Sequence, residues 1–277
     1  MRLGVRAHDF GKLPADELAA RIAGAGFRCV QLAPPKALAG FDAAGGGLNA
    51  ALAREAKAAF ARAGIEIAVL GCYINPVDPD AAQRGRQLER FKEYLRCARE
   101  FGCRIVGTET GSLQADFSFH PGNRGEDAFQ VLVGSVRELV REAERCDAIV
   151  GIEGVERYVI SDARRMRRLI DAIESPHLQV IFDPVNLLSA KNCTRQDDII
   201  RESFDLCGDR IAILHAKDFV LEAGVLRSVP AGRGKLNYGL VAELCRARTP
   251  AIDILMEDTE PATVADGVQF LRGAFAI

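Results

Sequence analysis

Short apolar runs alternate with longer amphipathic segments along the whole chain. The runs are hydrophobic at nearly every position, as strands buried on both faces of a parallel sheet are, and the segments between them repeat apolar residues at helical spacing. The runs predict strands at 3–7, 29–32, 66–70, 104–108, 148–153, 178–182, 211–214 and 252–256. Because helix-like segments separate them, the pattern predicts parallel βα units closed into a single (β/α)8 barrel.

The segments between the predicted strands have the pattern of helices. Apolar spacing, with Pro or Gly at several ends, predicts helices at 14–25, 49–63, 80–101, 162–173 and 196–207, and one that ends near 146. The longest connection follows the strand at 211–214, and in it two strand-like runs at 219–221 and 225–229 flank a Gly-containing turn. We predict a small hairpin there, a candidate lid. Such barrels take about 250 residues, so the chain is expected to be one domain over 1–277.

Four strands in succession end in a side chain that can bind a metal ion. These side chains are Glu153, Asp183, His215 and Glu257. Their separations of roughly 30 to 40 residues each suit one strand, one helix and two loops. Because the carboxyl ends of parallel barrel strands open onto one mouth, we expect the four side chains to converge there.

Taken singly, each of these residues has an ordinary structural explanation, since a carboxylate can cap the next helix and a histidine can be a hydrogen-bonded core residue. Together, three carboxylates in one buried pocket repel one another and require a cation or bound protons. Oxygen-rich ligation with one imidazole favours Mn²⁺, with Mg²⁺ and Co²⁺ as alternatives and Zn²⁺ as a less characteristic one. The set therefore predicts one divalent metal ion.

Charge, apolar runs and cysteines limit which partners and which cellular location we expect. A formal net charge of −2 gives no long-range attraction for nucleic acid or an anionic membrane, and no run approaches the ~18 apolar residues of a transmembrane helix. The eight cysteines contain no CxxC pair, and the N-terminus has no signal-peptide pattern. We therefore expect reduced thiols, a cytoplasmic location and small polar substrates. Homo-oligomers remain open, since exposed barrel helices commonly support dimers.

The order Glu, Asp, His, Glu at the ends of the last four strands resembles the xylose-isomerase-like barrel superfamily. Three stretches carry the resemblance further: FDPVN at 182–186, HAKD at 215–218 and VPAGRGKLNY at 229–238. The superfamily includes sugar and sugar-phosphate isomerases and epimerases, among them ketohexose 3-epimerases, and inosose dehydratases. The resemblance implies a single metal-binding barrel that acts on a small carbohydrate.

The resemblance also implies residue roles. In ketohexose 3-epimerase-like members the four matching residues bind one divalent ion and the two glutamates move protons. This implies metal ligation by Glu153, Asp183, His215 and Glu257, with Glu153 and Glu257 as the acid/base pair. Proton transfer through an enediolate then gives an epimer, or an aldose–ketose isomer if the proton returns to the adjacent carbon. Loss of a hydroxyl or an aglycone makes the same site a lyase, and a carbohydrate-binding barrel with a structural metal is a further alternative.

Two positions depart from the superfamily pattern. Many members have a histidine three residues after the aspartate that matches Asp183, where this chain has Asn186. Many also have a glutamate at the end of the strand that matches 29–32, where this chain has Gln31. Only His215 among the four histidines has a matching position. The histidine-rich three-zinc site of the endonuclease branch therefore cannot be assembled, and the net charge agrees in disfavouring a role on DNA.

Further candidates lie near strand ends or in the loops after them. Each has a structural alternative as a turn residue, a helix cap or a solvated cation. Arg6 faces the mouth or forms an ion pair at the barrel end. The residues predicted to contact substrate are His8, Tyr73, Glu109, Asn186, Lys217 and Arg233, the last two as grips for a phosphate or carboxylate.

Overall fold

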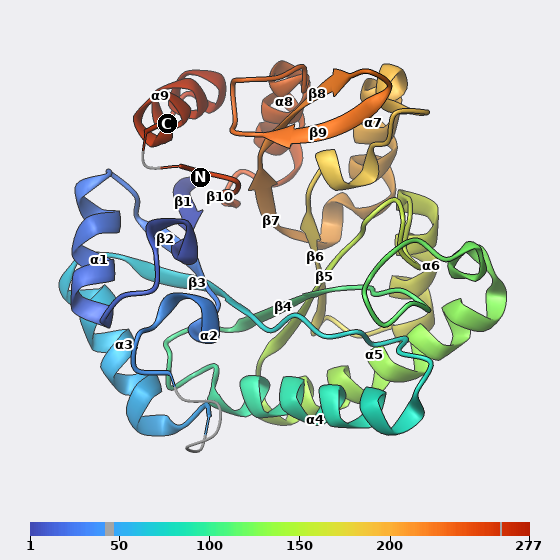
Figure 1. Cartoon of the computed structure of the whole chain (residues 1–277), viewed down its shortest axis with the longest axis horizontal. Coiled ribbons are helices and arrows are strands. Elements are labelled where there is room, and N and C mark those ends of the chain that lie inside the picture. The colour runs from blue at the N-terminus through green and yellow to red at the C-terminus, as the bar shows by residue number, and fades with distance from the viewer. Residues whose placement is uncertain (42–46, 261) are drawn as a thin grey trace.

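Eight parallel strands form a closed barrel in the computed structural model, which describes residues 1–41, 47–260 and 262–277. The strands are β1 (Arg2–Arg6), β2 (Cys29–Leu32), β3 (Glu66–Gly71), β4 (Ile105–Glu109), β5 (Ile149–Glu153), β6 (Leu178–Phe182), β7 (Ile211–Ala216) and β10 (Asp253–Met256). They follow one another in this order around the ring, and β10 pairs with β1 to close it. Helices surround the ring (Figure 1), which confirms the predicted (β/α)8 barrel.

The helices are α1 (Ala15–Gly24), α2 (Pro34–Ala37), α3 (Ala50–Arg62), α4 (Ala81–Cys97), α5 (Glu126–Cys146), α6 (Ala163–Ile173), α7 (Gln196–Cys207), α8 (Tyr238–Arg248) and α9 (Val264–Phe275). The helices predicted from the apolar spacing are present as α1, α3, α4, α5, α6 and α7, whereas α8 and α9 were not predicted. The prediction of helix over 80–101 is too long, because after Cys97 the chain tightens into three-residue turns that end at Gly102 with φ of +73°. The one-turn helix α2 was not predicted.

The predicted hairpin is present as the antiparallel pair β8 (Asp218–Glu222) and β9 (Val225–Val229). Its two-residue turn has positive φ at both Ala223 and Gly224, the conformation whose twist matches a hairpin. Strand β7 runs two residues beyond the prediction, since Ala216 still pairs with Met256 of β10. His215 is therefore held within a strand instead of in the loop after it.

A compact apolar cluster fills the barrel interior. It consists of Cys29, Val69, Ile181, Ile213 and Leu255, which come from five different strands. Side chains alternate along a strand, so His215, two residues after Ile213, faces the same interior one layer closer to the mouth. A larger apolar layer lies between strands and helices. Across the described ranges, no helix is long and apolar enough to cross a membrane.

Candidate metal centre

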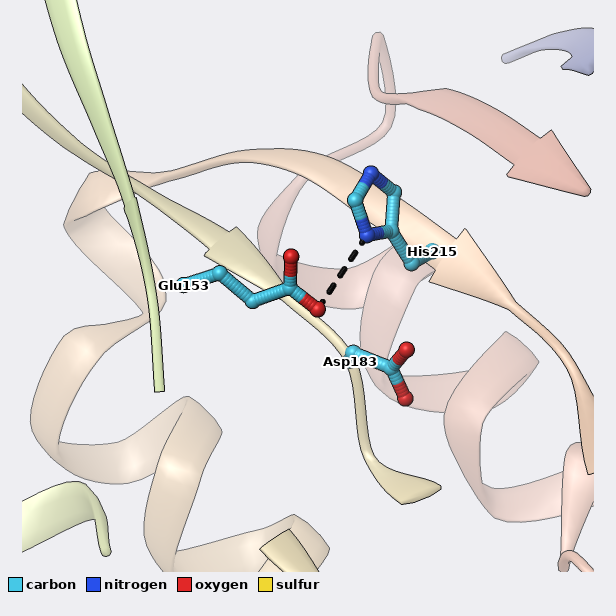
Figure 2. A group of neighbouring side chains, drawn as sticks. All are labelled: Glu153, Asp183 and His215. Atoms are coloured by element: carbon cyan, nitrogen blue, oxygen red, sulfur yellow. Dashed lines mark ion pairs between the residues drawn. The ribbon is translucent and has the colours of Figure 1, made fainter. Parts of the chain in front are cut away.

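Three of the four predicted ligands converge at the carboxyl ends of adjacent strands. Glu153 ends β5, Asp183 follows β6 and His215 lies in β7, and these strands are neighbours in the ring. One donor atom from each residue lies within 4.8 Å of the others, and all three side chains are buried. Figure 2 shows the carboxylate of Glu153 directed at the imidazole of His215, with Asp183 beside them.

Asp183 uses its two oxygens differently. Its Oδ1 accepts hydrogen bonds from the backbone N–H groups of Val185 (2.8 Å) and Asn186 (3.1 Å), at the start of the short 3₁₀ helix η3 (Val185–Leu187). Its Oδ2 is buried and lies 2.8 Å from Nζ of Lys217, with which it forms an ion pair. One oxygen of this aspartate therefore caps η3, and the other faces the charged cluster.

The surroundings of His215 define what each ring nitrogen does. Its Nε2 lies 2.8 Å from Oε1 of Gln31, and Nε2 of the same glutamine donates to the hydroxyl of Tyr73 at 2.5 Å. A carbonyl oxygen only accepts, so Nε2 carries a proton. The other nitrogen, Nδ1, faces Oε1 of Glu153 at 3.3 Å and Oε1 of Glu257 at 3.4 Å. Nδ1 and the two carboxylate oxygens are thus three potential acceptors, and no donor of the described residues lies between them.

A cation fits this arrangement. Among the described residues, Nδ1 of His215 has no hydrogen-bond partner although it is buried. Burial lowers the pKa of this imidazole, but the carboxylates of Glu257 and Glu153 outweigh burial and raise the pKa to about 9. Nδ1 therefore binds either a proton or a metal ion. Two carboxylates and an imidazole suit Mn²⁺ or Mg²⁺, which prefer oxygen-rich sites.

Glu257, the fourth predicted ligand, shares its carboxylate between the site and a lysine. Its Oε1 faces His215, while its Oε2 accepts a hydrogen bond from Nζ of Lys217 at 3.1 Å. The same Nζ lies 2.8 Å from Oδ2 of Asp183. Burial alone raises the pKa of Glu257, but His215, Lys217 and Arg6 together hold it below its usual range. Metal ligation by Glu257 remains a prediction, since it lies outside the three-residue cluster.

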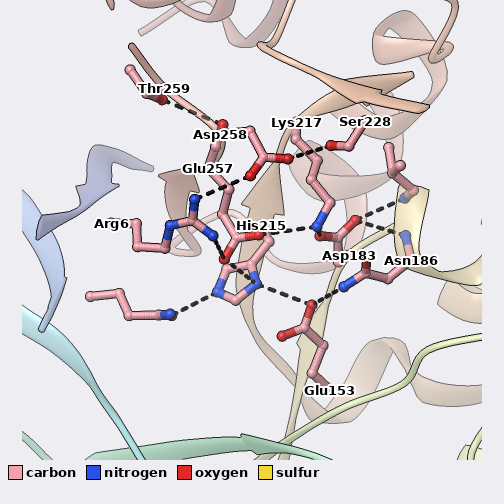
Figure 3. A network of polar contacts seen from close by, with 12 residues as sticks. Arg6, Glu153, Asp183, Asn186, His215, Lys217, Ser228, Glu257, Asp258 and Thr259 are labelled. Atoms are coloured by element: carbon pink, nitrogen blue, oxygen red, sulfur yellow. Dashed lines mark hydrogen bonds and ion pairs between the residues drawn. The ribbon is translucent and has the colours of Figure 1, made fainter. Parts of the chain in front are cut away.

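Lys217 is buried within the site, whereas a lysine in a loop is expected to be solvated. Its side chain is 9% exposed and bridges two buried carboxylates, as Figure 3 shows. The spacing contained a signal for this, because Lys217 follows His215 by two residues and so extends the same face of the chain. Its position gives it a structural role within the site, and two of its three N–H donors already have carboxylate partners.

Arg6 borders the site from β1. Its guanidinium pairs with Asp9 at 2.8 Å and with Asp258 at 3.1 Å, and it lies 3.8 Å from Oε1 of Glu257. Burial lowers the pKa of Arg6, but the surrounding carboxylates more than offset it. The barrel-end ion pair that the sequence allowed is therefore present, and it lies directly beside the candidate site.

A cavity of about 380 Å³ lies above these residues. Five of the six predicted substrate contacts line it, namely His8, Tyr73, Glu109, Asn186 and Lys217. Arg233 does not line it; this exposed residue pairs with Asp266 instead. The walls also include residues that were not predicted, namely Lys36, Phe117, Arg157 and Tyr158. Lys36 lies in the one-turn helix α2 and the other three lie in loops, where strand periodicity gives no signal.

Two side chains on the cavity wall have shifted acidity. Burial, together with the charges of Glu153 and Glu257, raises the pKa of Glu109 to about 7. Burial, with Arg6 and Lys36 nearby, lowers the pKa of His8 to about 4, so its imidazole is neutral at pH 7. Asn186 donates a hydrogen bond from Nδ2 to Oε1 of Glu153 at 2.6 Å. Asn186, which stands where many superfamily members have a histidine, thus forms a hydrogen bond with the candidate metal ligand Glu153.

Comparison with known proteins agrees with this picture. A family model described as xylose isomerase-like TIM barrel matches residues 19–274. The chain is 26% identical to D-psicose 3-epimerase of Enterocloster bolteae over 173 residues, which cover 61% of this chain and 52% of that protein. The match thus spans about half the length of that curated relative.

Solved structures share the fold across the chain. The apo form of the 3-keto-D-glucoside 4-epimerase YcjR from E. coli matches with a TM-score of 0.76 at 18% identity, covering 99% of each chain. A xylose isomerase-like TIM barrel protein from Mycobacterium smegmatis, in complex with magnesium, matches with a TM-score of 0.74 at 15% identity and covers 99% of this chain and 97% of its own. At these identities the similarity shows the fold alone.

Proposed function

The chain belongs to the xylose isomerase-like TIM barrel family, and from this premise we propose that it is a divalent-metal-dependent sugar isomerase or epimerase. The observation that carries the proposal is Nδ1 of His215, which has no hydrogen-bond partner among the described residues and is buried between the carboxylates of Glu153 and Glu257. The metal would be held by these three residues and Asp183, with Mn²⁺ preferred and Mg²⁺, Co²⁺ or Zn²⁺ as alternatives. The E. bolteae and E. coli proteins are both epimerases, which supports an epimerase here.

A bound divalent ion would supply a Lewis acid that stabilises negative charge on the oxygens of a hydroxy-ketone. The protein's own residues then move the proton. One glutamate takes a proton from the carbon beside the carbonyl, and the electron pair of that C–H bond moves onto the carbonyl oxygen to give an enediolate. The other glutamate, which starts protonated, returns a proton to the opposite face of the same carbon. The product is the epimer, with one glutamate protonated and one ionised as before.

The neighbouring side chains suit this division of labour. Glu153 and Glu257 approach the same imidazole nitrogen, so they flank one point from different strands. Asn186 fixes Oε1 of Glu153, and Lys217 fixes Oε2 of Glu257. Each glutamate keeps one oxygen directed toward the shared point while a hydrogen bond limits its rotation. Substrate contacts by His8, Tyr73 and the other predicted residues belong to the same proposal.

Glu109 favours a lyase as the second candidate. It is a further carboxyl group on the cavity wall, and the pKa of about 7 keeps much of it protonated at neutral pH. A protonated carboxyl can donate a proton to a departing hydroxyl or glycosidic oxygen after the carbon proton has been removed. The reaction would then be dehydration of a keto-inositol or release of an aglycone from a keto-glycoside.

One experiment separates these functions. Protein loaded in turn with Mn²⁺, Mg²⁺, Co²⁺ or Zn²⁺ is incubated in heavy water with ketoses, keto-inositols and keto-glycosides, and products and deuterium are measured by mass spectrometry. An epimerase or isomerase yields a rearranged sugar of unchanged composition that carries deuterium, whereas a lyase releases water or an aglycone. A chelated sample is the control. Ligand binding without turnover or deuterium uptake under any metal would show a carbohydrate-binding barrel and overturn the proposal.

A further inference from the structure

A groove of about 420 Å³ lies beside the cavity on the same end of the barrel. Its walls are the loop after β5, the segment from η3 to Ala190, and the tip of the β8–β9 hairpin. Aliphatic side chains form much of this surface: Val155, Val185 and Leu188 are buried, and Val225 on the hairpin is 53% exposed. The groove therefore presents a mixed surface, partly aliphatic and partly polar, next to a polar site.

The groove and the cavity adjoin each other. Arg157 and Asn186 line both of them. The amide of Asn186 donates to Oε1 of Glu153, so this one side chain touches the reacting end of the cavity and the wall of the groove. A ligand that reacts at Glu153 and extends past Asn186 would enter the groove directly.

The groove is preformed because the hairpin is anchored at its base and beside the site. Asp218, at the start of β8, accepts backbone hydrogen bonds from Leu236 (2.7 Å) and Gly232 (3.2 Å). Ser228 on β9 donates to the carboxylate of Asp258, the residue after Glu257. Figure 3 shows both Ser228 and Asn186 within the polar network of the site. The hairpin is thus held at its base and beside the site, and its tip forms one wall of the groove.

We propose that the groove is a second subsite, which takes a ring joined through a glycosidic oxygen to the reacting sugar. The substrate is then a glycoside, a more specific class than free ketoses; this inference rests on the proposed function. The cavity of about 380 Å³ beside the candidate metal ligands is large enough for the reacting sugar, since pockets of about 300 Å³ and above bind small ligands. The groove would hold the second ring. The apolar floor suits the C–H face of a second sugar or an aromatic aglycone, and the polar rim of Glu156, Ser189 and Ser228 suits hydroxyl groups.

Calorimetric titration of the metal-loaded protein with the methyl, phenyl and glucosyl glycosides of one 3-keto-hexose tests the subsite. The phenyl or glucosyl compound is expected to bind about tenfold more tightly than the methyl compound, as burial of one ring face predicts. A gain for phenyl alone identifies an aromatic aglycone, and a gain for glucosyl alone or for both identifies a second sugar ring as an occupant. Equal affinities for all three compounds would overturn the inference.

Two hairpin variants localise the effect. Val225→Asp places a charge in the groove and is expected to remove the gain of the longer glycosides while leaving the methyl glycoside unchanged. Leu221→Asp is the matched control, because Leu221 is 39% exposed on the same hairpin and does not line the groove. Equal effects of the two variants would contradict the subsite, as would a change of oligomeric state in Val225→Asp without a ligand effect.

The subsite and the proposed function can be overturned independently, because affinity tests the subsite and deuterium exchange tests the function. If the longer glycosides bind with the predicted gain but no deuterium enters them under any metal, the subsite stands and the proposed epimerase function falls. If free ketoses exchange deuterium and a second ring adds nothing to affinity, the function stands and the subsite falls.

Discussion

At the scale of single residues, the chemistry of the site depends on which atoms have partners. His215 donates from Nε2 to Gln31 and presents Nδ1 to carboxylates, and Asp183 caps η3 with one oxygen and pairs with Lys217 through the other. These bonds orient the side chains before any ligand binds. Hydrogen bonds of this kind to metal ligands typically change metal affinity by about 10–100-fold.

Replacement of the imidazole tests whether Nδ1 is a ligand. We expect His215→Gln to weaken Mn²⁺ binding by at least about 100-fold, since it removes a direct ligand and not merely a residue that orients one. Calorimetric titration measures the affinity, and circular dichroism checks the fold. His177→Gln is the matched control, because His177 precedes β6 and its Nδ1 lies 2.6 Å from the backbone oxygen of Ala148. Equal Mn²⁺ affinity in the two variants would exclude His215 as a ligand.

Lys217 offers a second test at this scale, because it supplies positive charge to two buried carboxylates. We expect Lys217→Met to destabilise the metal-free protein by about 3–5 kcal/mol, the usual cost of leaving a buried charge unpaired. Added Mn²⁺ is expected to restore part of this loss, because a cation at the cluster offsets the same carboxylates. Urea unfolding with and without Mn²⁺ gives both numbers.

The control for this variant is another paired lysine. Lys92 contacts Glu138 at 2.5 Å and Glu89 at 3.4 Å, but both carboxylates are about half exposed. Lys92→Met is therefore expected to cost no more than about 1 kcal/mol, with or without Mn²⁺. If Lys217→Met costs as little, the lysine does not neutralise the cluster.

At the scale of elements, the sequence predicts strands better than the contacts between them. Continuous apolar runs located all eight barrel strands, and the polar residues at four of their ends marked Glu153, Asp183 and His215 correctly as neighbours. The bond from Gln31 to His215 joins strands that are far apart in the chain, so only barrel closure creates it. Lys36 in the one-turn helix α2 and Arg157 in a loop belong to no periodic pattern, and so their place on the cavity wall had no signal.

The base of the β8–β9 hairpin depends on a glycine. A Cβ atom at Gly234 would lie 2.3 Å from the backbone oxygen of Phe219 and 2.4 Å from Oδ1 of Asp218. We expect Gly234→Ala to destabilise the fold by about 1–3 kcal/mol, as overpacking does, and to increase amide hydrogen exchange along β8 and β9. Gly273→Ala is the control, because no heavy atom among the described residues lies within 4 Å of its added Cβ and it sits within α9. Equal exchange in both variants would show that this contact does not anchor the hairpin.

At the scale of the whole molecule, barrel closure sets the geometry of the site. Arg2 on β1 pairs with Asp253 on β10 and with Glu66 on β3, at the end of the barrel opposite the candidate metal centre. Inside, the apolar cluster supports the strands just below the ligands. A site whose ligands come from separate strands keeps the distances between those ligands only while the ring stays closed. This agrees with one folding unit over 1–277, which stays a prediction.

The barrel interior connects packing to the metal ligands through Gly151, which lies two residues before Glu153 on β5. A Cβ atom there would approach Ile105 to 2.9 Å and Cδ1 of Ile181 to 3.0 Å. Overpacking at this point displaces β5 and with it Glu153. A mutation in the interior should therefore affect both stability and metal affinity.

A double-mutant cycle tests this coupling. Gly151→Ala is expected to cost about 1–3 kcal/mol and Ile181→Val about 0.5–1.5 kcal/mol. Because valine lacks the Cδ1 that the new methyl group would meet, the double variant should lose at least about 0.5 kcal/mol less than the sum, and should recover Mn²⁺ affinity lost in Gly151→Ala. Urea unfolding and Mn²⁺ titration measure the two effects. Gly134→Ala, at a helix position with no described heavy atom within 4 Å, should be additive with Ile181→Val; additivity at Gly151 as well would show that interior packing does not position Glu153.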